Sequence, residues 1–198
     1  MQEQFNIVVL ISGKGTNLQA LIDASRKSTY KISAVISNNA KAIGLSRATT
    51  SGIDTYVIEP KSFNSQLEFE NSLAARIAEI NPNLIVLAGF MKVLGPQFIK
   101  LFHGKIINIH PSLLPEYPGL NTHQRVLKDK KKIHGVSIHF VTEDLDGGPI
   151  IAQDQVDVLS DDTLESLARR VLEREHIIYP KVVESLALGK IQISDYEV

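Results

Sequence analysis

The sequence contains no cysteine, which excludes disulfides, a thiol nucleophile and cysteine-ligated metal sites. It also has no excess charge: 21 Lys and Arg residues against 22 Asp and Glu give a formal net charge of −1, which is not the basic footprint of a nucleic-acid-binding protein. No apolar run approaches the ~20 residues of a membrane-spanning helix. The N-terminus lacks the basic start and apolar core of a signal peptide. We therefore expect a cytoplasmic protein that contacts neither nucleic acid nor membranes.

The pattern of apolar residues predicts an α/β fold. A length of 198 residues, 43% of them hydrophobic and 22% charged, suits a single globular domain over 1–198. Continuous apolar runs typical of buried parallel strands alternate with helical spacing, which favours right-handed βαβ units. The strands are predicted at 7–11, 32–36, 55–58, 84–88 and 105–109, and the helices among them at 18–22, 42–48 and 65–80.

The rhythm changes in the C-terminal part. Strands at 136–141 and 150–158 are separated only by a short glycine-rich link, which suits antiparallel pairing. A final helix is predicted over 163–188, with Asp162 and Glu165 as a capping box. Pro180 is expected to kink this helix or to end its regular hydrogen bonding. The predicted fold is thus a mostly parallel central sheet flanked by helices, with antiparallel strands in the C-terminal part.

A glycine-rich segment, Ser12-Gly-Lys-Gly-Thr-Asn17, joins the first predicted strand to the first helix. Its glycines allow a tight turn, and N–H groups at a helix start favour a bound anion such as phosphate. The P-loop spacing is absent, Leu18 occupies the third glycine position of a dinucleotide fingerprint, and no acidic residue follows the second strand. A monophosphate on a small molecule fits better than NAD, with an ordinary glycine-rich turn as the alternative.

Asn108 and His110 end a predicted strand and lie two residues apart, so an extended backbone points both side chains to one side. Three prolines in 111–118 enforce a rigid loop after them. Ligands of open α/β sheets bind at such carboxyl ends of strands. We therefore expect a site here, although the pair could simply satisfy backbone groups of the loop.

Asp146 precedes two glycines, which alone would indicate a plain turn. With the glycine-rich loop and the Asn-x-His pair, however, it completes a set that suits acyl-type transfer to an amine. An imidazolium and an amide can stabilise a developing oxyanion, and a neighbouring carboxylate keeps the imidazole charged. Neither a His-Glu-x-x-His metal motif nor a Gly-x-Ser-x-Gly elbow is present.

Glu175 lies 11 residues after Leu164 and so near the middle of the apolar stripe of the last predicted helix. A buried carboxylate is costly unless it is paired. From the helix alone, pairing with a cation of the protein and a place in a ligand site remain equal alternatives.

Four segments in the same order resemble the phosphoribosylglycinamide formyltransferase family: 12–17, Val-Leu-Ala-Gly-Phe-Met-Lys-Val-Leu (86–94), Asn-Ile-His-Pro-Ser-Leu-Leu-Pro (108–115) and His-Phe-Val-Thr-Glu-Asp-Leu-Asp-Gly-Gly-Pro (139–149). The resemblance covers essentially the whole chain. It implies a Rossmann-like formyltransferase fold and transfer of a formyl group from 10-formyltetrahydrofolate, as co-substrate, to the amino group of glycinamide ribonucleotide in purine (IMP) biosynthesis. It implies small-molecule partners, no metal, and a monomer or homodimer.

The resemblance also implies roles for residues at matching positions. Its catalytic set is Asn108, His110 and Asp146. The ribonucleotide would be held by Gly13, Lys14, Gly15, Thr16, Asn17 and Glu175, which decides the Glu175 alternatives in favour of a ligand site. The folate would be lined by Met91, Lys92, Val93, Leu94, Asn108, Thr142, Glu143, Asp144, Leu145 and Asp146.

The implied mechanism is direct attack of the amine on the formyl carbon, with the oxyanion held by His110 and Asn108 while Asp146 keeps the histidine protonated. Many relatives carry histidine where this chain has Asn121, and an arginine of some relatives falls near Gln66, to which we carry over no role. Among the other histidines, His103 and His134 are expected in surface or turn positions. His123 and His139 could lie near the site, but a purely structural role is favoured for each.

Three rivals remain. Methionyl-tRNA formyltransferases share the catalytic residue types but normally add a C-terminal tRNA domain, for which a chain ending at Val198 leaves no room. Hydrolases of 10-formyltetrahydrofolate usually carry an N-terminal regulatory domain, whereas here the first strand begins by Phe5. A non-catalytic phosphometabolite-binding module would need the glycine-rich loop but not the catalytic set. The discriminating observation is whether loss of the formyl group requires the amine.

Overall fold

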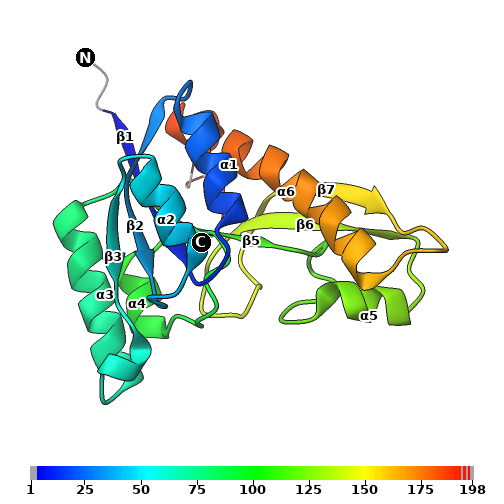
Figure 1. Ribbon diagram of the computed structural model, residues 1–198, viewed down its shortest axis with the longest axis horizontal. Helices are drawn as coiled ribbons and strands as arrows, with labels where there is room; N and C mark the ends of the chain where they lie inside the picture. The colour runs from blue at the N-terminus through cyan, green and yellow to red at the C-terminus, as the bar shows by residue number, and fades with distance from the viewer. Residues whose placement is uncertain (1–3, 193, 195, 197–198) are drawn as a thin grey trace.

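The computed structural model describes residues 4–192, 194 and 196, in which seven strands form one sheet in the order β3-β2-β1-β4-β5-β6-β7 (Figure 1). Strands β1 to β5 are parallel, and β6 runs antiparallel to both of its neighbours. The predicted fold class is confirmed. The strands are β1 (Phe5–Ile11), β2 (Tyr30–Ser37), β3 (Asp54–Val57), β4 (Leu84–Leu87), β5 (Ile106–His110), β6 (Ile133–Phe140) and β7 (Ile150–Asp157).

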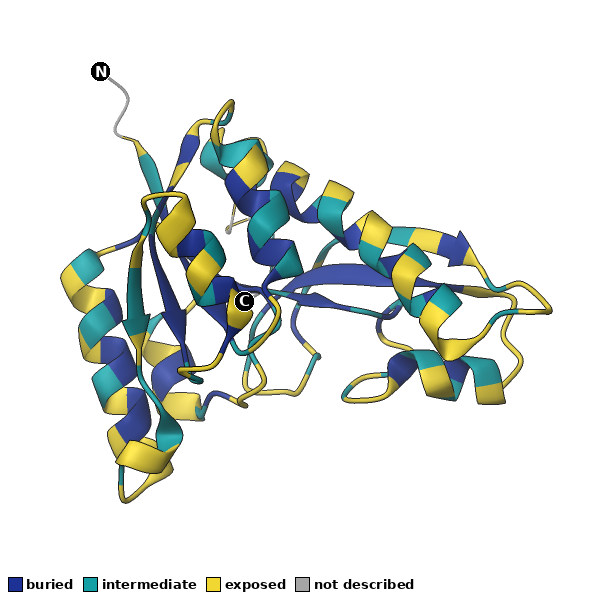
Figure 2. Ribbon diagram, in the orientation of Figure 1, coloured by how far each residue is buried: buried dark blue, intermediate teal, exposed yellow. Residues whose placement is uncertain are grey.

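Helices cover both faces of the parallel part of the sheet. Alternation along β1 explains the two layers: Ile7, Val9 and Ile11 face one hydrophobic cluster, and Val8 and Leu10 face the other. Figure 2 shows the result, with dark buried strands in the middle and helices striped by burial. The first cluster packs under α1 (Thr16–Ser25), α2 (Ile43–Thr50) and α6 (Leu164–Ala187), and the second under α3 (Gln66–Ile80) and α4 (Pro96–Leu101).

Three short elements are not expected from the sequence pattern: α4, the 3-10 turn η1 (Pro60–Ser62) and α5 (Thr122–Lys128). They span six, three and seven residues, too few for an apolar period to be recognisable. Proline occupies the first turn of both α4 and η1, where its missing N–H has no intrahelical partner to lose. Lys128, the last residue of α5, begins a run of charged residues that continues to Lys132.

The last helix differs from its prediction in its capping box. Its capping box is formed by Thr163 and Ser166, one residue later than the predicted Asp162 and Glu165, and Asp162 instead forms an ion pair with Arg170 at 2.7 Å. The helix continues past Pro180 to Ala187, close to its predicted end at 188. Val182 and Val183 are buried beyond the proline, and this packing outweighs the missing hydrogen bond.

Candidate functional site

The carboxyl ends of β4 and β5 open into a cavity of about 1010 Å³. Its wall is completed by the segments 119–124 and 141–146 and by Leu164 and Ala168 at the start of α6. The order β2-β1-β4 reverses the direction of strand progression next to this opening, and such a switch point is where open α/β sheets bind ligands. The wall is predominantly apolar, which suits a large flat organic ligand with few polar contacts.

Every residue that the resemblance assigned to folate lines this cavity. Met91 and Val93 are each 71% exposed at its rim, whereas Leu94 is buried and anchors the same segment. Leu145 is exposed on the opposite segment. Two apolar rims that face one cavity suit an aromatic ligand, because each exposed side chain gains contact area when the cavity is filled.

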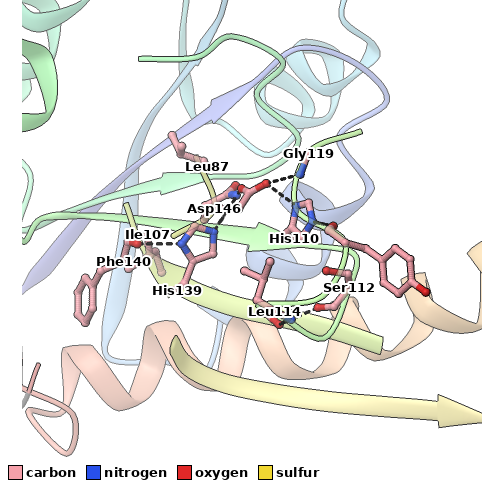
Figure 3. Close-up of polar contacts among 12 residues, drawn as sticks. Leu87, Ile107, His110, Ser112, Leu114, Gly119, His139, Phe140 and Asp146 are labelled. Atoms are coloured by element: carbon pink, nitrogen blue, oxygen red, sulfur yellow. Dashed lines mark hydrogen bonds and ion pairs between the residues drawn. The ribbon is translucent and has the colours of Figure 1, made fainter. Parts of the chain in front are cut away.

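His110 lines this cavity. It has partners at both ring nitrogens (Figure 3). Nε2 is 2.9 Å from the carbonyl oxygen of Tyr117, which can only accept, so Nε2 carries a proton. Nδ1 is 3.4 Å from Oδ2 of Asp146, a carboxylate that also accepts. Both side chains are over nine-tenths buried. Two acceptors around one ring accommodate the imidazolium form of His110.

Asp146 is fixed by its backbone as well as by His110. Its φ is +52°, in the left-handed region, and Oδ2 accepts a hydrogen bond from the N–H of Gly119 at 2.8 Å. The following chain passes so close to β6 that a Cβ at Gly148 would lie 1.9 Å from the carbonyl oxygen of Phe140. The glycine at 148 is therefore required for the approach that brings Asp146 beside His110.

His139, whose role the sequence left open, is a neighbour of the predicted catalytic set. Its Nε2 is 3.2 Å from Nδ2 of Asn108 and 3.7 Å from Oδ1 of Asp146, so it touches two of the three predicted catalytic side chains. It is 2% exposed, and burial lowers its pKa. No local signal marks it, because the contact is created by the pairing of β5 with β6.

The loop after His110 is held by residues that sequence reasoning missed. Ser137 on β6 donates to the carbonyl oxygen of Ser112 at 2.6 Å and accepts from the N–H of Leu114 at 2.9 Å. Gln153 on β7 donates to the carbonyl oxygen of Leu114 and to Ser137 Oγ. These contacts fix the backbone that presents the Tyr117 carbonyl to His110.

The glycine-rich turn before α1 is built for a close backbone approach. Gly15 has φ +68°, and a Cβ there would lie 2.6 Å from Cα of Gly44 on α2. Arg47, one turn further along α2, donates through Nε to the carbonyl oxygen of Lys14 at 3.0 Å. Thr16 and Asn17 then begin α1, whose first N–H groups face the turn. This geometry suits an anion at the predicted position, Gly13 to Asn17.

Glu175 is buried, as its position on the apolar stripe of the helix predicted. Its partner is a neutral side chain and not a cation of the protein. Oε2 accepts a hydrogen bond from Asn17 Nδ2 at 2.6 Å, and burial raises the Glu175 pKa while this bond opposes the shift. Asn17 Oδ1 is buried without a hydrogen-bond partner among the described residues. The contact joins α6 to the glycine-rich turn and leaves the amide oxygen of Asn17 available for a ligand.

The two predicted substrate regions do not share the large cavity in the described structure: Gly13 to Asn17 and Glu175 lie outside its lining. They are linked through Ser12. Its Oγ accepts from the N–H of Met91 at 2.7 Å, and its N–H donates to the carbonyl oxygen of Gly89 at 3.1 Å. The glycine-rich turn is therefore tied directly to the segment that lines the cavity.

His123 and His134 form a hydrogen-bonded pair, with 3.0 Å between Nδ1 and Nε2. His123 lines the cavity, and His134 is 1% exposed on β6, so its predicted surface or turn position is wrong. Burial, together with the nearby His123 and His110, lowers the pKa of His134 to about 4. His103, by contrast, is exposed in a turn, as expected.

Two structural features are missing from the described part of the chain. Across residues 4–192, 194 and 196, no group of three or more His, Cys, Asp or Glu side chains has a metal-binding arrangement. Within the same residues, no helix combines the length and the apolar character needed to cross a bilayer.

Comparison with known proteins places this chain in a family. The formyl transferase family model matches residues 5–183. The phosphoribosylglycinamide formyltransferase of Escherichia coli strain K12 is 45% identical over 96% of this chain and 91% of its own length. The trifunctional purine biosynthetic protein adenosine-3 of Gallus gallus is 44% identical over 96% of this chain, which spans 19% of that longer protein.

A solved structure agrees with the sequence relatives. Phosphoribosylglycinamide formyltransferase from Coxiella burnetii superposes with a TM-score of 0.91 at 51% identity, covering 94% of this chain and 89% of that one. The family match spans most of the chain and includes all four segments on which the resemblance rested. The chain therefore belongs to the formyl transferase family, and the resemblance found in its sequence is confirmed.

Proposed function

We propose that the protein transfers a formyl group from 10-formyltetrahydrofolate to the amino group of 5'-phosphoribosylglycinamide, giving formylglycinamide ribonucleotide and tetrahydrofolate. The observation that carries the proposal is the buried contact of His110 with Asp146, 3.4 Å apart, among the residues that line a cavity large enough for a folate. The names of the relatives support the substrate pair and its place in purine biosynthesis.

The folate would occupy the large cavity. Its apolar wall, with Met91, Val93 and Leu145 at the rims, favours burial of the pteridine and benzoyl rings, and the formyl group would lie toward His110. The ribonucleotide phosphate would lie on the glycine-rich turn, where backbone N–H groups at the start of α1 favour an anion. Glu175 would accept hydrogen bonds from the ribonucleotide and give its buried carboxylate further partners.

The proposed reaction needs no covalent enzyme intermediate. The amine nitrogen forms a bond to the formyl carbon, the carbonyl oxygen becomes an oxyanion, and the bond from that carbon to N10 of the folate then breaks. One proton leaves the amine and one reaches N10. His110 as imidazolium and the amide of Asn108 would stabilise the oxyanion, and each such donor contributes about 10²–10³ in rate.

Asp146 would favour the charged form of His110. The 3.4 Å between Nδ1 and Oδ2 is longer than the roughly 2.7–2.9 Å typical of a charge-assisted bond, so the Nδ1 proton can be shared with a substrate oxygen. A water between Asp146 and the amine could carry the released proton. In this scheme His110 stabilises the oxyanion, and Asp146 keeps His110 in its charged form.

The rival activity is hydrolysis of the formyl-folate, because the same three side chains could stabilise attack by water. The glycine-rich turn and the Asn17–Glu175 contact favour the transferase, since a hydrolase would have no use for them. The test is absorbance-monitored loss of the formyl group from 10-formyl-5,8-dideazafolate with and without glycinamide ribonucleotide. Turnover that requires the ribonucleotide supports the proposal, and formate release without any amine would replace it by hydrolysis.

A further inference from the structure

His139 is buried directly opposite Asn108. The two residues are partners in the antiparallel pairing of β5 and β6, and His139 is 2% exposed. Side chains of directly opposed residues lie within contact distance on one face of a sheet. Here that contact is polar, with 3.2 Å between Asn108 Nδ2 and His139 Nε2. The role of His139 therefore depends on how it interacts with the amide of Asn108.

The partners of His139 fix its protonation. Nδ1 is 2.8 Å from the carbonyl oxygen of Phe140, which only accepts, so Nδ1 carries a hydrogen and donates it. Nε2 faces an amide nitrogen, which only donates, so Nε2 presents its lone pair. His139 is thus the neutral ring with its hydrogen on Nδ1. Its burial acts in the same direction, because burial disfavours a charged imidazole.

This tautomer decides which end of the Asn108 amide meets the substrate. A primary amide has a donor end and an acceptor end of nearly equal size, and rotation by half a turn exchanges them. An acceptor at His139 holds the Asn108 nitrogen, which has a second N–H for the cavity that Asn108 lines. If the amide rotated, its carbonyl oxygen would replace a donor and repel a developing oxyanion.

We propose that His139 is a positioning residue for the transfer reaction: as a neutral acceptor it orients the Asn108 amide with its free N–H toward the reacting carbonyl. The inference rests on the proposed function and deepens it. His139 is among the residues that line the cavity, but this role requires neither contact with the substrate nor exchange of a proton with it. It acts only through Asn108.

Because His139 in this tautomer has no proton on Nε2 to donate, Asp146 can pair with His110 alone. Asp146 Oδ1 is 3.7 Å from His139 Nε2, and Oδ2 is 3.4 Å from His110 Nδ1, so the carboxylate lies between two imidazoles (Figure 3). If Nε2 of His139 carried a proton, it would donate that proton to Asp146 or to the carbonyl oxygen of Asn108. With Nε2 unprotonated, the carboxylate has one imidazolium partner, and the positive charge stays at His110.

The test is a double-mutant cycle measured as kcat of formyl transfer at saturating substrates. Asn108→Ala should lower kcat by about 10²–10³-fold. His139→Leu, which removes the acceptor but stays apolar and buried, should reproduce most of that loss with little change in either KM. In the Asn108→Ala background, His139→Leu should cost no more than about two-fold further, because its partner is already gone. His139→Gln, whose amide oxygen can replace the Nε2 lone pair, should recover part of the loss.

A matched control is His134→Leu, the same change at a buried histidine on the same strand that contacts His123 instead of Asn108. Its effect should be the same in the wild-type and in the Asn108→Ala backgrounds. Unfolding midpoints of each variant separate lost stability from lost orientation.

Two results would count against the proposal in different ways. If His139→Leu lowers kcat by the same factor whether or not the Asn108→Ala change is present, the effects are additive and the positioning role is overturned. If Asn108→Ala alone leaves kcat unchanged, the proposed function loses its oxyanion donor, which is a distinguishable failure.

Discussion

The two halves of the proposed site differ in how complete they are without ligand. On the folate side, His110, Asp146 and Asn108 each have protein partners, and the cavity beside them is already formed. On the ribonucleotide side, Asn17 Oδ1 lacks a partner among the described residues, and the carboxylate of Glu175 is buried against one neutral amide. The folate side, the first half, is preorganised for chemistry. The ribonucleotide side, the second half, holds buried polar atoms to which a ligand could hydrogen-bond.

This contrast follows from the chemistry assigned to each half. Stabilising a transition state requires donors that are fixed before the reaction, because reorganisation would reduce their contribution. Binding a phosphorylated substrate with good specificity favours groups that are poorly satisfied in its absence, because each then discriminates against ligands that cannot pair with it. Changes in the first half should therefore affect kcat, and changes in the second half should affect ribonucleotide binding and stability.

The largest effect is expected at Asp146. Asp146→Asn keeps the size of the side chain and an acceptor for the N–H of Gly119, but removes the charge beside His110. We expect kcat to fall by about 10²–10⁴-fold with a much smaller change in KM for either substrate. Steady-state kinetics would measure both. A variant with full kcat and only a raised KM would show that Asp146 belongs to binding, and the contrast between the halves would fail.

Gly15→Ala should have the next largest effect, and on the other half. The new Cβ would lie 2.6 Å from Cα of Gly44 at a φ of +68°, so the glycine-rich turn must move away from α2. We expect KM for the ribonucleotide to rise at least ten-fold, about 1.4 kcal/mol in binding, while KM for the folate changes little. The matched control is Gly52→Ala, which has a φ of +70° but no described atom within 4 Å of the new Cβ.

If Gly52→Ala and Gly15→Ala destabilise the protein equally, backbone strain alone accounts for the loss of stability. A KM for the ribonucleotide that is unchanged in Gly15→Ala would remove the glycine-rich turn from the substrate site.

Much of the site could be predicted from sequence because it depends on local pattern. Asn108 and His110 share a side through the period of a strand, and Glu175 lies on the buried face through the period of a helix. The contacts of His139, Ser137 and Gln153 could not be predicted, because strand pairing over long chain separations creates them.

The wrong expectation for His134 has a related cause. An imidazole on a strand gives no sign of whether another imidazole, here His123, will satisfy it. Burial of a polar side chain depends on such a partner, and the partner comes from a different element, α5.

Glu175→Gln tests the second half through stability. Burial raises the Glu175 pKa, so the folded protein binds this proton more tightly than the unfolded chain, and the carboxylate form opposes folding. The neutral glutamine can still accept from Asn17. We expect Glu175→Gln to unfold at a higher temperature than the wild type at pH 7. The difference should shrink as pH falls through the raised pKa toward the ordinary value of a glutamic acid.

Ribonucleotide binding should weaken in the same variant, because the amide keeps only one acceptor where the carboxylate has two. Equal stability of Glu175→Gln and the wild type at every pH would contradict the buried-charge account.

The smallest effect is expected from His134. Its pKa of about 4 lies below the ordinary 6.5 of histidine, so the unfolded chain binds more protons between these values. Stability conferred by the neutral His134 should be present above about pH 6.5 and should be lost as pH falls toward about 4. The denaturation midpoint of the wild type should change between neutral pH and about pH 4. The change should be smaller for His134→Gln, because glutamine does not titrate. An equal acid loss in both proteins would assign it to other groups.

The most direct test of the central claim follows the carbon that is transferred. The protein would be incubated with 10-formyltetrahydrofolate labelled with ¹³C in the formyl group and with glycinamide ribonucleotide, and the products would be identified by NMR and mass spectrometry. The account predicts that the label appears as a formamide on the glycinamide nitrogen, together with one equivalent of unlabelled tetrahydrofolate. Label recovered as free formate, with the ribonucleotide unchanged, would contradict it.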